Sequence, residues 1–290
     1  MKKLFLSLLA ILTILVGLTA PARAVSVQID NGGMNFGPGD PLNIRAGIAN
    51  SSGPETADAY LALILPDTTP IFFEFSATGL TASAATYDPA TWRKFLSNIT
   101  VPSPLNTGLI PILNYRVTGA EPSGTYQTVF LLTNAGTLDV LAVAVAPFFV
   151  GSHPVSVILG SYSGTWSNQT YGTSGPINFL IADSQPGFLT METTLGGSVF
   201  GEPAPSPFAV SADLRAPGVI TLSGGSGPFG TITGTIGPGG AFQATLSSVP
   251  GGIISSATAS GTLLNGAFNV GYTINFYGGN PATGMVSAQR

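Results

Sequence analysis

The sequence predicts an all-β protein of two domains, an antiparallel sandwich followed by an up-and-down barrel. Three observations predict this fold class. Apolar and polar residues alternate with a period of two along much of the 290 residues, which is the pattern of half-buried strands. The 38 Gly and 23 Pro residues fall between these runs, as turn residues do. Only 8% of the residues are charged, which excludes a coiled coil and a disordered polyelectrolyte.

The first 24 residues have the pattern of a secretory signal peptide. Lys2 and Lys3 precede an apolar run that leads to the small-residue site Ala22-Arg23-Ala24. The run is shorter than the roughly 20 residues that a membrane-spanning helix needs. We therefore expect cleavage after Ala24 and export to the periplasm, the cell surface or the medium of a bacterium, with no membrane span in the mature chain.

Residues 25–150 form the first predicted domain. Apolar and polar residues alternate from 42 to 49, and further strand patterns cover 59–65, 71–75, 126–133 and 138–146. Turn residues separate the runs, as at 66–70. Short strands with frequent turns predict an antiparallel sandwich.

The sequence Ser123-Gly124-Thr125-Tyr126 stands just before one of these strands. It resembles the Gly-x-Tyr that opens the penultimate strand of many immunoglobulin-like domains, where the tyrosine hydroxyl bonds to the backbone at the sheet corner. The resemblance implies an immunoglobulin-like sandwich with Tyr126 in a structural role. It implies no activity, because a fold alone does not specify one.

The segment near 89–99 departs from the strand pattern. Asp88 and Pro89 have the composition of a helix start. Four apolar residues then follow at the spacing of one helical face: Trp92, Phe95, Leu96 and Ile99. This predicts a short helix with Arg93 and Lys94 on its polar face. The spacing favours burial of Trp92, and the alternative is an exposed aromatic surface for a sugar.

Residues 151–156, including His153, form the predicted linker, and 157–290 form the second domain. Ten strand patterns follow at nearly even spacing: 162–167, 177–183, 188–194, 208–214, 219–223, 231–236, 241–247, 257–264, 267–276 and 283–288. Gly-rich turns between them predict a meander that forms a barrel, with a second sandwich as the alternative. Two turn-and-strand sequences, which end in Ala241-Phe242 and Ala267-Phe268, resemble each other as successive hairpins would.

The sequence Gly164-Thr165-Trp166 opens this half. It resembles the Gly-x-Trp first strand of lipocalin-like and avidin-like barrels. The resemblance implies a calycin-like barrel with Gly164 in a structural role and Trp166 at its floor. The biotin site of the avidin family needs several Trp side chains, and Trp166 is the one Trp of this half. The resemblance therefore extends to the fold and not to the ligand.

The stretch 216–289 contains no Asp, Glu, Lys, Arg or His. Exposed sheet edges normally carry Lys, Pro or a bulge, because an open edge pairs with other chains. We expect this sheet to close on itself. The alternatives are an edge that pairs with another protein, in a surface array or fibre, and a sheet kept short by Gly and Pro kinks.

The inventory of reactive residues excludes several kinds of site. There is no Cys, and His153 is the one His, so Cys catalysis, disulfides and the usual zinc sites are excluded. No sequence context supports a Ser-His-Asp triad. Glu192 and Asp213 could act as a hydrolytic carboxylate pair if they met across strands. We expect no catalytic residue and no cofactor.

Three carboxylates are weak candidates for a calcium site at one end of the first domain: Asp30, Asp40 and Asp58. Carboxylate oxygens are suitable ligands for calcium, but Asx turns explain the same residues. No further metal site is expected.

These observations favour an exported, non-catalytic binding or structural module that contacts a protein, a glycan or a surface. Contact residues would include Trp92, Arg93, Lys94 and Trp166. A formal net charge of −4 gives nucleic acid no reason to bind. The alternatives are a barrel that carries a small apolar ligand and a carboxylate-dependent hydrolase. An open lumen would favour the carrier, and a lumen packed with side chains would favour a scaffold.

Overall fold

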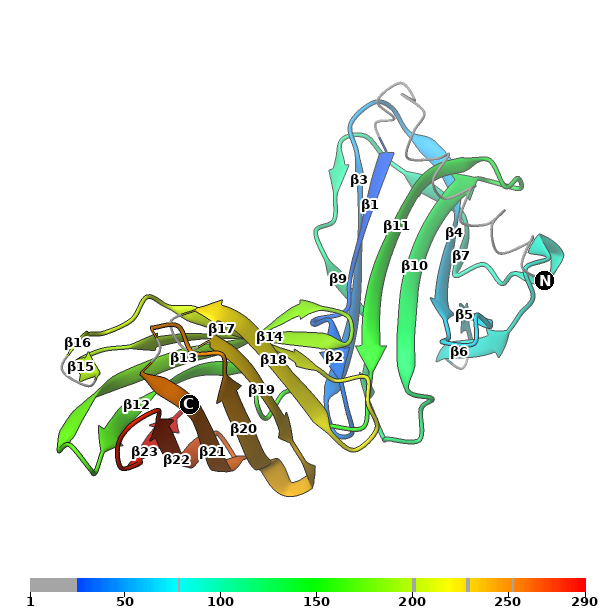
Figure 1. The fold of residues 1–290 in the computed structure, drawn as a ribbon. Coiled ribbons are helices and arrows are strands. Elements are labelled where there is room, and N and C mark those ends of the chain that lie inside the picture. The colour runs from blue at the N-terminus through cyan, green and yellow to red at the C-terminus, as the bar shows by residue number, and fades with distance from the viewer. Residues whose placement is uncertain (1–24, 78, 200–201, 228–229, 252) are drawn as a thin grey trace.

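The computed structural model describes residues 25–77, 79–199, 202–227, 230–251 and 253–290. The predicted signal peptide, 1–24, lies outside them. The described chain is all-β and forms two domains in sequence (Figure 1), so the predicted fold class of sandwich and barrel is confirmed. Within these ranges, no helix is long and apolar enough to cross a membrane.

Two sheets face each other in the first domain. One contains β1 (Val25–Asp30), β3 (Pro41–Asn50), β8 (Leu105–Asn106) and β9 (Ile110–Arg116). The other contains β2 (Asn35–Phe36), β4 (Glu55–Ile64), β5 (Pro70–Ser76), β6 (Gly79–Ala84), β7 (Leu96–Val101), β10 (Gly124–Asn134) and β11 (Val140–Val150). Alternate side chains of both sheets point into the space between them. Ile44, Leu61 and Leu132 are fully buried there.

Tyr126 lies at a corner of this sandwich. Its hydroxyl donates to the carbonyl of Pro122, four residues earlier, at 2.7 Å. Its ring stacks on Phe148 with 5.3 Å between centroids. This is the corner hydrogen bond that the Gly-x-Tyr sequence implies. Burial raises the pKa of Tyr126 to about 12, so the hydroxyl keeps its proton and remains a donor over the physiological range.

The helix predicted near 89–99 is wrong. Only Pro89–Thr91 form a 3₁₀ turn, capped by the Asp88 carboxylate, which accepts a hydrogen bond from the Ala90 N–H at 3.0 Å. Trp92 has an extended backbone and ends the turn, and Leu96–Val101 become strand β7 along part of β4, with one irregularity in the pairing. The β-branched residues at 99–101 suit a strand, and the free edge of β4 supplies hydrogen-bond partners. This pairing is long-range, so helical spacing in the sequence does not reveal it.

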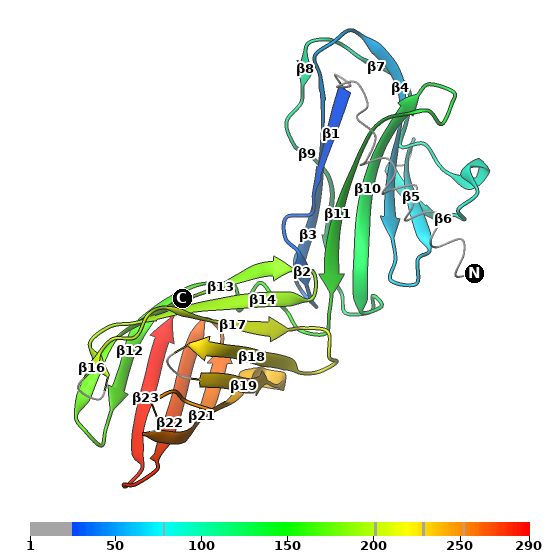
Figure 2. The same ribbon diagram turned by 45° about the horizontal axis from the view of Figure 1, so that its top comes forward.

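The second domain is a closed antiparallel barrel of ten strands (Figures 1 and 2). They are β12 (Gly160–Asn168), β13 (Thr173–Gln185), β14 (Phe188–Leu195), β17 (Phe208–Asp213), β18 (Ile220–Gly227), β19 (Gly230–Ile236), β20 (Ala241–Ser247), β21 (Ile254–Leu264), β22 (Ala267–Phe276) and β23 (Ala282–Gln289). The short strands β15 (Ser198–Val199) and β16 (Glu202–Pro203) pair with each other, and Pro238–Gly240 form a 3₁₀ turn. The closure predicted for the uncharged stretch is confirmed.

The seam of the barrel is the pairing of its first and last strands. Strand β12 pairs with β23 from Ser163 opposite Gln289 to Asn168 opposite Gly284. At Gly164 an added Cβ would lie 2.0 Å from the carbonyl oxygen of Ser287. Only glycine fits there, because no side-chain carbon can approach a backbone oxygen so closely. Gly164 therefore has a structural role at the seam.

A buried asparagine joins the two domains. Asn35 of β2 is 3% exposed. Its amide donates to Asp183 Oδ1 at 2.8 Å and accepts from the Gly187 N–H at 2.6 Å. The same NH₂ also donates to the carbonyls of Gln185 and Phe188. All four partners lie around the β13–β14 turn of the barrel, so this side chain fixes that turn against the first domain.

A buried carboxylate supplies the second connection. Asp40, 2% exposed, accepts from the Val155 N–H at 2.7 Å and from the Gly37 N–H at 2.8 Å. The Ser156 N–H and hydroxyl also donate to it. Val155 belongs to the barrel core, so Asp40 fastens the linker to both domains. Figure 2 shows the barrel set at an angle to the long axis of the sandwich.

Candidate functional site

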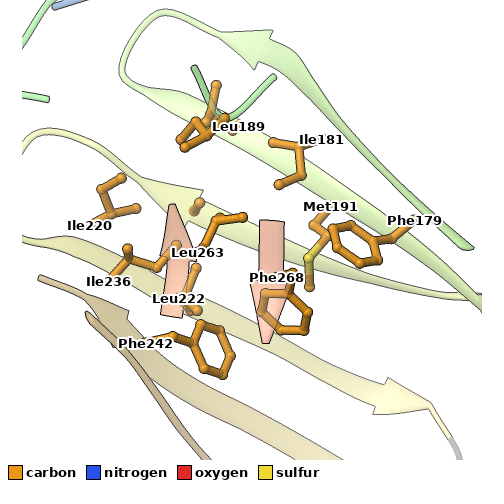
Figure 3. A pocket seen from close by; sticks show the side chains of 12 residues that line it. Phe179, Ile181, Leu189, Met191, Ile220, Leu222, Ile236, Phe242, Leu263 and Phe268 are labelled. Carbon is orange, nitrogen blue, oxygen red and sulfur yellow. The ribbon is translucent and has the colours of Figure 1, made fainter. Parts of the chain in front are cut away.

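The barrel lumen is the enclosed space of the fold. Inward side chains from the barrel strands, and one from the segment just before β12, line it: Ile158, Phe179, Ile181, Leu189, Met191, Ala212, Ile220, Leu222, Ile236, Phe242, Leu263 and Phe268 (Figure 3). Every lining side chain is apolar. This lining, as far as the structure describes it, presents no donor, acceptor or charge that could orient a polar substrate. Elsewhere on the inward faces of the barrel strands, Asn168 and Thr193 are buried, and each has a polar atom with no hydrogen-bond partner among the described residues.

The lining side chains fill the lumen. Phe268 packs edge-on against Phe179 and Phe242, with centroid distances of 5.3 and 5.2 Å. Tyr162 stacks on Phe179 at 4.6 Å. The cavity that these side chains enclose measures about 20 Å³, which is room for about one water molecule. Of the two outcomes weighed from the sequence, the packed lumen is the one observed.

Trp166 lies in this core rather than on a binding surface. Its side chain is 6% exposed, and its indole N–H donates to the carbonyl of Gly196 at 2.9 Å. Gly175 lies opposite it on β13, where an added Cβ would approach the indole nitrogen to 2.8 Å. Trp166 thus packs at the seam side of the barrel, and the structure gives it no open face for a ligand.

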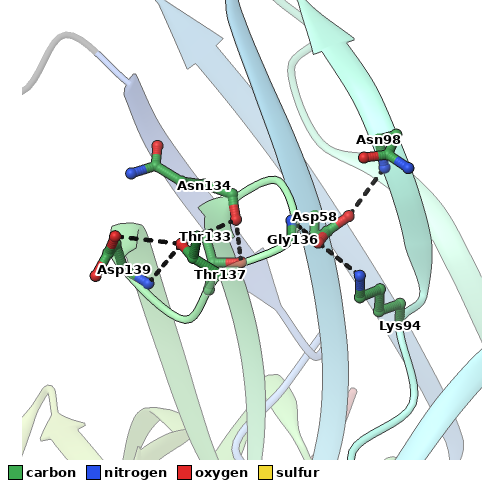
Figure 4. Close-up of polar contacts among 8 residues, drawn as sticks. All are labelled: Asp58, Lys94, Asn98, Thr133, Asn134, Gly136, Thr137 and Asp139. Carbon is green, nitrogen blue, oxygen red and sulfur yellow. Dashed lines mark hydrogen bonds and ion pairs between the residues drawn. The ribbon is translucent and has the colours of Figure 1, made fainter.

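A buried ion pair lies on the first domain (Figure 4). The side chain of Asp58 on β4 is fully buried, and Lys94 Nζ lies 2.7 Å from its Oδ2. The N–H groups of Asn98 and Gly136 donate to the same carboxylate at 2.9 and 2.8 Å. These partners belong to the strand-β7 segment and to the β10–β11 turn. Asp58 thus holds two separate parts of the chain, the β7 segment and the β10–β11 turn, against β4.

These partners also decide the ionisation of Asp58. Burial alone would raise its pKa, but the Lys94 hydrogen bond and the two backbone N–H donors outweigh burial and hold the pKa below its usual value. The same hydrogen bond raises the pKa of Lys94. Both groups therefore remain charged at neutral pH, which fits a structural ion pair and not a general acid or base.

Trp92 packs over the outer face of the same sheet. Its ring stacks on Phe72 at 5.4 Å and meets Tyr60 edge-on at 6.0 Å. The indole N–H donates to the Thr86 carbonyl at 3.2 Å. The ring is half-buried, so it covers the sheet in place of the predicted helix. Its neighbour Arg93 is exposed.

The proposed calcium ligands do not form a site. Asp30 pairs with Arg45 and caps the Gly32 N–H, while Asp40 and Asp58 are fully engaged by the partners given above. No group of three or more His, Cys, Asp or Glu side chains suited to a metal occurs among the described residues. The three weak candidates for calcium therefore do not converge, because each carboxylate stabilises a different loop.

The candidate catalytic carboxylates also remain apart. Glu192 of β14 lies opposite Ala209, whereas Asp213 of β17 lies opposite Phe188 at the other end of the same pairing. Asp213 is bonded to Arg215, whose side chain holds its pKa below the usual value. The pair that a glycoside hydrolase needs is not assembled.

His153 lies in the linker and takes no part in a catalytic arrangement. Burial lowers its pKa. Its Nε2 is buried with no hydrogen-bond partner in the part of the chain that the structure describes. Its carbonyl lies so close to Gly37 that a Cβ there would clash at 1.7 Å. This residue belongs to the joint between the domains.

Sequence reasoning missed the residues of that joint. Asn35, Asp40 and Asp183 meet partners more than a hundred positions away. A short-range sequence pattern does not reveal contacts between residues so far apart. The one available signal was the Gly-rich sequence around Asp40, which marked a close approach of backbone without saying to what.

No protein-family model matches the chain, and the search of curated proteins found no match. Among solved structures, the crystal structure of Rv2717c from M. tuberculosis is similar over 47% of this chain and 94% of its own, with 16% identity and a TM-score of 0.37. Spo0M, a sporulation control protein from Bacillus subtilis, is similar over 59% and 79%, with 10% identity and a TM-score of 0.28. At TM-scores this low, neither likeness carries an argument.

Proposed function

We propose that this chain is an exported, non-catalytic binding or structural module of the bacterial periplasm or cell surface. The observation that carries the proposal is the filled barrel lumen. Since the interior is a packed apolar core, contacts with partners must use the outer surfaces of the two domains. The joint built by Asn35 and Asp40 supports a rigid two-domain unit, which suits a scaffold.

The same proposal includes finer assignments of the two folds. An immunoglobulin-like sandwich is supported by the corner hydrogen bond of Tyr126. A calycin-like barrel is supported by Gly164 at the seam and by Trp166 in the core. Both assignments agree with a structural role, because such scaffolds present surfaces and need no catalytic groups.

Native mass spectrometry of the protein purified from the envelope of its own host tests this function. We expect a chain that begins at Val25 and carries no bound small molecule. A stoichiometric apolar ligand would contradict the packed lumen, and an uncleaved chain would contradict export through the predicted signal peptide.

A carrier of a small apolar ligand is the second candidate, and the wholly apolar lining favours it. Met191 is a flexible lining residue that could adjust to a guest. A lipophilic fluorescent dye provides a direct test. The carrier predicts saturable binding that Phe268→Trp blocks, while the filled core predicts no saturable binding.

A further inference from the structure

The end of the barrel away from the first domain exposes a group of large apolar side chains. Ile253 is 69% exposed, Tyr277 73% and Tyr171 55%. The Tyr277 N–H donates to the Ile253 carbonyl at 3.0 Å, and the Tyr171 ring lies 6.5 Å from the ring of Phe276. We call Tyr171, Ile253 and Tyr277 the rim. These residues come from three different turns, so the fold gathers them.

An uncharged wall adjoins the rim. On β18–β23 most outward positions carry short hydroxyl and amide side chains, with Leu264 and Met285 as exposed apolar exceptions. One row of hydroxyl side chains is continuous in register across the six strands. The row comprises Ser223, Thr233, Thr245, Thr258, Thr273 and Thr283. Adjacent members are separated by about 5 Å, the spacing of paired strands. The Thr283 N–H donates to the Thr170 hydroxyl at 2.9 Å, which connects the row to the turn that carries Tyr171.

Charged groups stand only at the margins of this wall. Asp213 and Arg215, before β18, are paired with each other at 2.7 Å. Arg290, after β23, donates to the carbonyls of Ser156 and Leu159. The stretch between them, 216–289, contains no charged residue. An ionic ligand would therefore lose its hydration without gaining an opposite charge.

We propose that the rim and the wall together bind an uncharged polysaccharide chain. Tyrosine rings give large, rigid, amphipathic contacts for the apolar faces of sugar rings. Threonine hydroxyls and asparagine amides both donate and accept, as neutral sugar hydroxyls require. Threonine is stiff at χ1, so ordering the row costs little side-chain entropy.

Other classes of partner fit this surface less well. The closed barrel has no free edge to which an extended peptide could add as a strand. Nucleic acid requires basic side chains, and a lipid surface requires a contiguous apolar face instead of alternating hydroxyls. The proposal depends on the proposed function in one respect, because it places recognition on the outside of the barrel.

A glycan array that carries both uncharged and acidic polysaccharides tests this site with the full mature chain. We expect signal only on uncharged glycans. The double variant Tyr171→Ala/Tyr277→Ala should bind about tenfold more weakly, the loss expected for two aromatic contacts. Tyr171→Phe/Tyr277→Phe should retain most of the binding, because the rings remain.

Two further variants complete the test. Thr245→Lys places an ammonium group on the wall and should also weaken binding, whereas Tyr87→Ala removes an exposed tyrosine of the first domain and should change nothing. Far-UV circular dichroism checks that each variant is folded. The proposal is overturned by absent binding to every uncharged glycan, by equal binding of acidic glycans, or by full binding of the Tyr171→Ala/Tyr277→Ala protein. If any of these occurs while native mass spectrometry shows an empty barrel, the glycan site fails and the proposed function stands.

Discussion

In the first domain buried carboxylates hold loops in place, whereas the last six strands of the barrel contain no charged side chain. Asp58 binds Lys94 and two backbone N–H groups on the outer face of its sheet, beneath the segment that carries Lys94 and Asn98. In the barrel the equivalent restraint comes from closure, through the pairing of β12 with β23. The two domains therefore stabilise antiparallel sheets by different physical means.

The difference follows from topology. The sandwich has sheet edges and a long connection between β6 and β9, and both need polar partners that hold them against the sheets. A closed barrel has no edge strand, so it does not need charged residues to prevent pairing with other chains. This is why a stretch as long as 216–289 can remain uncharged, with mostly hydroxyl and amide groups on the outer face of the strands that the structure describes there.

Both domains contain a tyrosine whose hydroxyl donates to a backbone carbonyl four residues earlier. Tyr126 donates to the carbonyl of Pro122 at 2.7 Å, and Tyr162 donates to that of Ile158 at 2.9 Å. In each case a tyrosine near the start of a long strand bonds four residues back. Both rings are buried, so each bond fixes the approach of the chain to its sheet.

The largest expected effect is the removal of a core ring from the barrel. Phe268→Ala should destabilise the barrel by about 3–5 kcal/mol, because it opens a cavity beside Phe179 and Phe242. Each domain has one Trp, so urea unfolding of the barrel can be followed by Trp166 fluorescence in a Trp92→Phe background. The matched control is Tyr277→Ala, which removes a ring of the barrel that is 73% exposed. An equal loss in both variants would contradict a packed lumen.

Removal of the buried carboxylate should have the next largest effect, and in the other domain. Asp58→Ala leaves the N–H groups of Asn98 and Gly136 without their acceptor, a cost of about 2–3 kcal/mol. Trp92 fluorescence in a Trp166→Phe background should show it. Asp139→Ala, at an exposed carboxylate near the same turn, is the control. If the barrel loses as much stability as the sandwich, the claim that this carboxylate stabilises the sandwich alone is contradicted.

The joint should contribute about 2 kcal/mol of coupling. Asn35→Ala removes a side chain that bonds four groups of the β13–β14 turn, so the two domains should unfold at separate urea concentrations. Small-angle X-ray scattering should show a larger radius of gyration for this variant. Asn114→Ala, at an exposed amide, should leave both measurements unchanged. An unaltered single transition in Asn35→Ala would mean that the joint does not couple the domains.

Acid should lower the stability of the sandwich more than that of the barrel, and this effect should be smaller than the ones above. Burial raises the pKa of Glu121, but hydrogen bonds from Tyr115 and Thr118 outweigh it and lower the pKa to about 2. The pKa of Asp58 is also lowered. Lowered carboxyl pKa values add stability above the unfolded-state pKa of about 4, and this stability is lost as the pH falls toward the folded-state value.

The sandwich should therefore lose about 1 kcal/mol or more between pH 5 and pH 2, and the barrel less. Urea unfolding at both pH values, with the two single-Trp backgrounds, measures each domain. A barrel that loses more stability than the sandwich would contradict this assignment of charge.

Short-range sequence patterns predicted those parts of the fold that depend on residues close together in the sequence. The ten barrel strands could be predicted because alternation of apolar and polar residues and Gly-rich turns are short-range signals. The segment near 89–99 could not, because its residues satisfy helical spacing as well as the pairing of β7 with β4. The Asp58–Lys94 ion pair and the contacts of Asn35 depend on chain segments far apart in sequence. The absence of charge in the sequence indicated an uncharged surface on these strands. The continuous row of hydroxyl side chains could be recognised only from the register of the strands.

Hydrogen exchange tests the central claim, that the barrel is closed around a packed core, most directly. In a closed barrel every strand has a hydrogen-bonded neighbour on both sides. Successive N–H groups of a strand point alternately to its two neighbours. We therefore predict slow exchange of both alternating sets of amides in all ten strands, including β12 and β23 at the seam. Rapid exchange of alternate amides along any two strands would reveal open edges, and it would contradict the account.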